Sequence, residues 1–173
     1  MLTTSNQAAE TTLHRGIDMT ADGISTEDWE VVKDFAAKIA NAVCAEDNAN
    51  SQRLTEDLLR YLERLETKYG RLPSIIATKA DYTTELNQRV QLLKQAYALA
   101  KQSNDKVNMT LTASSLAQLF VEETLDVSSA QAWLALLSNA LGDNWDDLEH
   151  QEFLKLQGEL ESLKRRAKPS SLA

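Results

Sequence analysis

The residues that could carry chemistry are few in this sequence, and they form no pattern typical of a catalytic or metal site. His14 and His150 are the only histidines, whereas a zinc site needs three or four converging ligands. His150 follows Glu149 in an acidic stretch, so we interpret it as a solvated surface residue. Cys44 is the single cysteine, and no base partner marks it as a nucleophile, so we expect it to be a small buried hydrophobe.

Three charged stretches could bind ions or partners. Residues 46–57 have the length of an EF-hand calcium loop. However, Ser51 stands where that loop requires glycine, and Asp57 stands where it requires the final glutamate, so we do not expect calcium binding. For the acidic stretch 143–152 we favour a helix start with a solvated face over a site for a cation or a basic partner. The basic residues of 164–168 suit a helix end, where cations complement the helix dipole. The sequence therefore predicts no catalytic residue, no metal and no cofactor, and we expect a protein that is not an enzyme.

Length and composition predict a single all-helical domain. The chain has 173 residues, enough for one hydrophobic core. Its 5 glycines and 2 prolines are few, while alanine, leucine, glutamate and glutamine, which lose little entropy in helices, are plentiful. The net charge of -8 argues against nucleic-acid binding. We also expect no membrane contact and a cytoplasmic location, because the sequence shows neither a transmembrane run nor a secretory signal.

Apolar residues recur every three or four positions and predict seven helices separated by short breaks. Ser25 and Asp28 begin the first helix with a capping-box-like signal, and Gly70 and Gly142 are placed to end two others. We expect a mobile arm over residues 1–24, a helical domain over 25–168 and a tail over 169–173. The first helix runs to a turn at 47–50, and the others are predicted at about 51–69, 73–80, 85–103, 108–123, 128–141 and 144–168.

Short breaks make neighbouring helices antiparallel, either in a stacked array or in a closed bundle. Pairing the helices gives units of 26–69, 73–106 and 107–142, and the last two approach the roughly 34-residue period of the tetratricopeptide repeat. The segment 92–142 resembles that family in its small and apolar positions. The residues that carry the resemblance are Leu93, Ala96, Leu99, Ala100, Leu116, Ala117, Phe120, Ala130, Leu134 and Leu137.

The resemblance implies a right-handed array of stacked helix pairs, with residues 144–168 as a capping helix. The sequence departs from the family at 124–127, where the usual turn residues are missing, and at Leu137, where a small residue is usual. Such arrays bind partners on a concave surface lined by the first helix of each pair. Position in this pattern makes the following residues partner-binding candidates: Asp34, Lys38, Lys79, Ser114, Gln118 and Val121.

We therefore expect a non-enzymatic protein–protein interaction or adaptor module that binds a protein or peptide. The alternative is a small-ligand-binding or regulatory helical domain with a pocket between helices. The sequence does not distinguish a monomer from a homodimer.

Overall fold

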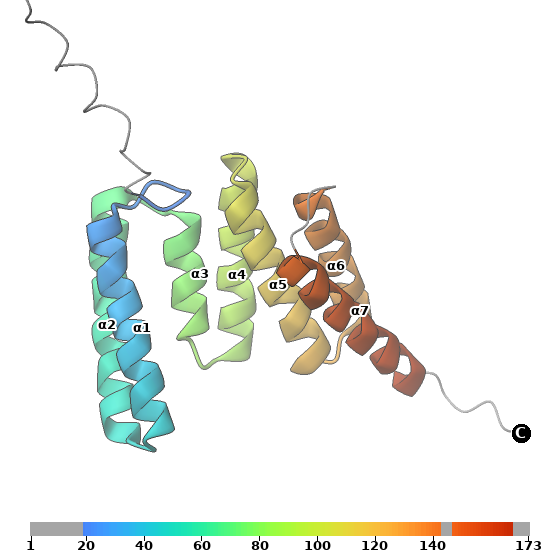
Figure 1. Cartoon of the computed structure of the whole chain (residues 1–173), viewed down its shortest axis with the longest axis horizontal. Coiled ribbons are helices and arrows are strands. Elements are labelled where there is room, and N and C mark those ends of the chain that lie inside the picture. Colours follow the sequence, from blue (N-terminus) through green and yellow to red (C-terminus); the bar gives the residue numbers. More distant parts are fainter. Residues whose placement is uncertain (1–18, 143–146, 168–173) are drawn as a thin grey trace, which may run out of the picture.

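The structure is a computed structural model that describes residues 19–142 and 147–167 (Figure 1). Seven α-helices account for most of these residues, and they contain no β-strand beyond one isolated bridge between Met19 and Ser25. The predicted all-α class is therefore confirmed. The helices are α1 (Thr26–Cys44), α2 (Asn48–Tyr69), α3 (Pro73–Asp81), α4 (Leu86–Gln102), α5 (Lys106–Glu122), α6 (Val127–Leu141) and α7 (Asp147–Ala167).

Side-chain caps fix most of the helix starts. The Ser25 hydroxyl accepts a hydrogen bond from the Asp28 backbone N–H at 3.3 Å, which confirms the predicted start of α1. The predicted turn at 47–50 is wrong, because the Asp47 carboxylate caps α2 by accepting from the Asn50 N–H at 3.2 Å. The predicted start of α6 at Ser128 is also wrong, since α6 begins after Asp126, whose carboxylate accepts from the N–H groups of Ser128 and Ser129.

Each helix packs mainly on its neighbours in sequence, so the helices form an open succession (Figure 1). The hairpin of α1 and α2 lies at one end of this succession, and α6 and α7 lie at the other. Only α5 contacts four other helices, namely α3, α4, α6 and α7. Neither α1 nor α2 packs on α5, α6 or α7, so the described helices do not close into a bundle around one shared core.

The apolar side chains form two cores. The smaller core lies between α1 and α2 and includes Ile75 from α3, with Leu58 and Leu62 fully buried. The larger core joins α3 to α7 and contains the fully buried small residues Ala113, Ala117 and Ala130. Small side chains let helix backbones approach closely, and α5 is thereby enclosed on most of its sides. None of the helices in the described ranges is long and apolar enough to cross a membrane.

Residues 19–24 belong to the folded body, which corrects the predicted boundary of the N-terminal arm. Ile24 is fully buried in the smaller core. The Asp22 carboxylate accepts hydrogen bonds from the Ser74 N–H at 2.8 Å and from the Ser74 hydroxyl at 2.7 Å. It thereby satisfies the start of α3, where Leu72 offers no capping side chain. The remainder of the expected arm and the expected tail at 169–173 lie outside the described residues.

Leu62 provides a test of the smaller core, because its side chain is fully buried whereas that of Glu63 is exposed. Leu62→Ala is expected to lower the free energy of unfolding by about 2–5 kcal/mol, since it deletes buried methyl groups and leaves a cavity. Glu63→Ala should change it by less than about 0.5 kcal/mol. Chemical denaturation measures both values, and equal losses would contradict the assignment of this helix face.

Removing α7 tests whether the helices form an open succession and do not share one core. Truncation after Gly142 deletes the contacts of α7 with α5 and α6, including the buried Leu156, Leu160 and Leu163. Because contacts run between neighbours, the remaining helices should keep most of their far-UV circular dichroism per residue. The uncovered apolar surface should bind hydrophobic dyes and promote self-association in size-exclusion chromatography. Global loss of helix would contradict this arrangement.

Candidate functional site

The candidate site is a groove between α5 and α7, floored by α6. It consists of a cavity of about 170 Å³ and an adjoining one of about 240 Å³, which share Thr110, Leu111, Leu141 and Glu149. We call this feature the α5–α7 groove. Its other lining residues are Lys106, Val107, Ser114, Ser115, Gln118, Leu137, Ala140, Glu152 and Phe153.

The groove exists because α5 is buried on most of its sides and open along one stripe. Its buried residues include Ala113, Leu116, Ala117 and Phe120, which face α4, α6 and the rest of the larger core. Its least buried residues recur every three or four positions and therefore lie along one stripe of the helix. These residues are Val107, Leu111, Ser114, Ser115, Gln118 and Glu122.

Apolar side chains gather at the start of this stripe. Val107 and Leu111 are 57% and 58% exposed, although they belong to the most enclosed helix of the chain. Leu148 on α7 is 66% exposed and lies one turn before Glu152 on the same side of that helix. These three are among only seven large apolar residues that are exposed in the described part of the chain. Apolar surface concentrated in this way, beside a groove, is typical of an interaction site.

Carboxylates border the groove. The exposed Glu122 accepts hydrogen bonds from the Gln118 amide at 3.0 and 3.2 Å, and this neutral amide gives it no compensating charge. The exposed Glu152 makes no ion pair with any residue that the structure describes. Glu149 lines both cavities, and Lys106 at the start of α5 lines the smaller opening. The groove is therefore apolar along its floor and mainly acidic at its edges.

The six residues predicted from sequence do not form one surface. Ser114 and Gln118 line the α5–α7 groove, whereas Val121 is only 5% exposed in the larger core and cannot face a partner. Asp34 and Lys38 pair with each other at 2.6 Å on α1, and α1 packs on α2 alone among the helices. Lys79 on α3 is largely buried by its ion pair with Glu66. The regular stacking assumed for these positions does not extend to α1, so their predicted alignment is wrong there.

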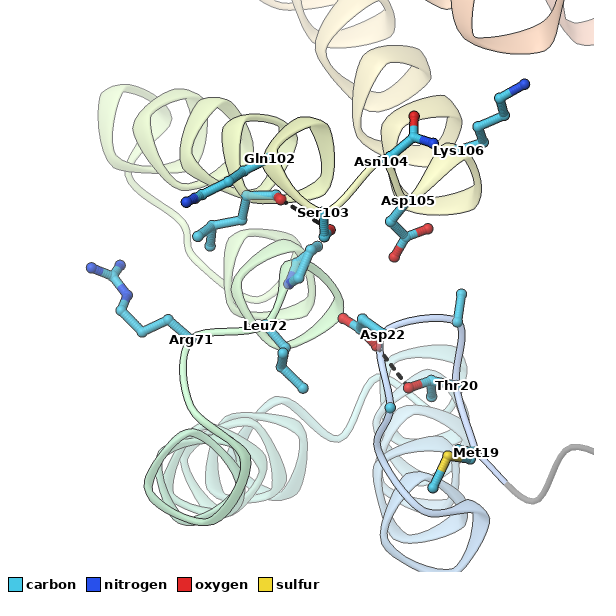
Figure 2. A pocket seen from close by; sticks show the side chains of 14 residues that line it. Met19, Thr20, Asp22, Arg71, Leu72, Gln102, Ser103, Asn104, Asp105 and Lys106 are labelled. Carbon is cyan, nitrogen blue, oxygen red and sulfur yellow. Dashed lines mark hydrogen bonds between the residues drawn. The ribbon is translucent and has the colours of Figure 1, made fainter.

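A larger recess of about 970 Å³ lies where residues 19–23 meet the α2–α3 connection and the α4–α5 turn (Figure 2). Its two carboxylates both serve helix starts, because Asp22 caps α3 and Asp105 accepts from the Asn108 N–H at 3.0 Å. Figure 2 shows the Arg71 and Lys106 side chains extending outward from opposite sides of the recess. The recess is spacious, but its charged groups do not converge on a common point.

A network of charged and hydroxyl groups lies at the open end of the α1–α2 hairpin. The Asp28 carboxylate accepts from the Lys68 ammonium at 2.7 Å and from the Tyr69 hydroxyl at 2.6 Å. The Tyr61 hydroxyl lies 3.2 Å from the same carboxylate. These bonds, led by the one from Lys68, lower the pKa of Asp28 to about 2, and the same contact raises the pKa of Lys68. Because Asp28 and Lys68 are both held in their charged forms, the network joins α1 to α2, and neither group is poised to act as a general base.

The residues that first suggested chemistry are scattered. Cys44 is exposed at the end of α1, so the prediction of a buried cysteine is wrong. His150 is exposed on α7, and His14 lies outside the described residues. Most of the EF-hand-like stretch belongs to α2 and is not a loop. No group of three or more histidine, cysteine, aspartate or glutamate residues could hold a metal ion within the ranges that the structure describes.

Comparison with known proteins adds no relative: no protein-family model, no curated protein and no solved structure matches this chain.

The Asp28 network predicts a pH-dependent contribution to stability. Because the pKa of Asp28 is lowered from 3.8 to about 2 on folding, its ionised form stabilises the native state at neutral pH. This contribution is complete above about pH 4 and is lost as the pH falls towards 2. Asp28→Asn should therefore reduce the free energy of unfolding at pH 6, and its difference from the unsubstituted protein should shrink as the pH falls to 2.

Asp34→Asn is the matched control, because Asp34 lies on the same helix and pairs only with exposed Lys38. Exposed pairs of this kind contribute little to stability, so this variant should follow the unsubstituted protein throughout. Urea denaturation across the pH series measures the three curves. A constant difference between Asp28→Asn and the unsubstituted protein would contradict the network's role.

Proposed function

We propose that this protein is a non-enzymatic interaction module that binds a protein or peptide in the α5–α7 groove. The observation that carries the proposal is the single open stripe of α5. Most other sides of this helix are buried, yet Val107 and Leu111 expose more than half of their surface on the open side. Exposure of large apolar side chains is unfavourable in water, and a partner that covers them removes that surface from solvent.

The succession of helices supports the same proposal. Helices that pack mainly on their neighbours in sequence leave long surfaces uncovered, and helical-repeat proteins use such surfaces to hold extended partners. The tetratricopeptide-like pattern of 92–142 includes the whole of α5 and α6, which build one wall and the floor of the groove. Ser114 and Gln118, both proposed from that pattern, provide polar contacts between the apolar start of the stripe and Glu122.

A benzophenone cross-linker placed at position 118 tests this proposal in native cell extract. Gln118 is exposed on the groove stripe and donates its amide to Glu122 four residues later. Gln52 on α2 is equally suited to carry the cross-linker, since it is exposed and donates in the same way to Glu56. It lies far from the groove, on a helix that does not contact α5.

The cross-linker at position 118 is expected to yield a discrete adduct that the cross-linker at position 52 does not. Val107→Ser in the same protein should reduce the yield, because it removes apolar surface from the groove without touching the cross-linker. Absence of an adduct at 118, or an identical pattern from 52, would contradict the proposal.

The small-ligand alternative stays a prediction. The recess of Figure 2 is large enough for a small molecule. Its carboxylates are already engaged as helix caps, and we therefore favour the groove as the functional surface.

A further inference from the structure

We infer that the segment that occupies the α5–α7 groove is a basic amphipathic helix of another protein. This inference rests on the proposed function and adds the chemistry of the partner. It follows from three properties of the groove: two apolar walls, acidic edges and a net charge that disfavours a second copy of the chain.

The apolar residues suit the apolar face of a helix. Val107 and Leu111 lie one turn apart on α5 and line the groove from one side. Phe153 on the facing helix α7 lines it from the other side, and Leu141 at the end of α6 continues the apolar surface between them. An amphipathic helix binds such a groove by laying a stripe of apolar side chains between the two walls.

The acidic edges of the groove determine which side chains should flank the apolar stripe of the partner helix. Some carboxylates elsewhere in the chain are matched by a cation: Glu66 pairs with Lys79 and Arg71, and Glu123 with Arg89. Glu122 and Glu152 at the groove have no such match among the described residues. A partner with lysine or arginine on both sides of its apolar stripe would supply the missing charges, and oppositely charged surfaces also accelerate association.

Charge also argues for a different protein over a second copy. The chain carries a net charge of -8, so two copies repel each other as they approach. Its basic stretch at the end of α7 is attached to leucines that are already buried, including Leu160 and Leu163. That stretch therefore cannot offer an apolar stripe to another copy's groove without unpacking α7.

Two synthetic peptides of about 18 residues, each long enough for about 27 Å of helix, provide the probe. They share one stripe of leucines and differ only in their polar positions, which are all lysine in one and all glutamate in the other. Fluorescence anisotropy with the full-length protein should show binding of the leucine–lysine peptide that weakens as salt is added. The leucine–glutamate peptide should not bind.

Matched variants locate the binding on the protein. Val107→Ser should weaken binding of the leucine–lysine peptide about tenfold, whereas Val43→Ser should not change it. Val43 on α1 is 57% exposed, as Val107 is. The double variant Glu122→Gln, Glu152→Gln should weaken binding about two- to tenfold. The double variant Glu56→Gln, Glu63→Gln changes the net charge equally on α2 and should have little effect.

Several results would overturn the inference: no binding of the leucine–lysine peptide, equal binding of both peptides, or equal losses from the groove variants and their controls on α1 and α2. All variants lie at exposed positions, and thermal melting confirms that each is folded. A partner cross-linked at position 118 that lacks a basic helix would overturn this inference and leave the interaction function standing. Absence of any adduct there would contradict the function itself.

Discussion

Close packing around α5 is the constraint on which the rest of the structure depends. Ala113 and Ala117 on α5 and Ala130 on α6 are fully buried, and their small side chains let neighbouring backbones approach. α5 can therefore contact α3, α4, α6 and α7 at once. A helix enclosed in this way buries most of its apolar side chains, and apolar burial is the main favourable contribution to folding. The one side that no neighbour covers is the side that forms the groove, so the packing of the larger core also determines where a partner can bind.

The two cores divide the chain into two parts, each built by apolar burial. The larger core is a continuous apolar interior from α3 to α7, whereas the α1–α2 hairpin has its own core and meets α3 over a small area. Polar contacts strengthen that junction, notably the Asp22 carboxylate on Ser74 and the Glu66 ion pairs with Lys79 and Arg71. The hairpin carries the network around Asp28 at its open end. Apolar burial thus builds each part, and directional polar contacts set how the two parts meet.

The sequence predicted the helices well because their apolar period and caps are local signals. It predicted Gly70 and Gly142 as the ends of two helices for the same reason, and both glycines have a positive φ. It failed where two local signals competed, as at Asp47, whose side chain suits a turn equally well as a helix cap. It also missed the Asp22–Ser74 contact and the Asp28 network, because each joins residues more than 30 positions apart.

Of the residues that line the candidate site, the repeat pattern predicted Ser114 and Gln118. The groove itself depends on how α7 crosses α5, and spacing along the chain does not encode that geometry.

Thiol labelling of α5 tests the central claim that one side of this helix is open and is covered by a partner. In a Cys44→Ser background, which removes the exposed native thiol, Gln118→Cys reports on the groove and Ala113→Cys on the enclosed side. Position 118 should label rapidly in the purified protein and several-fold more slowly in dialysed native extract, while position 113 should resist labelling in both. Gln52→Cys on α2 should label at the same rate in both. Equal rates at 118 in the two preparations, or rapid labelling at 113, would contradict the account.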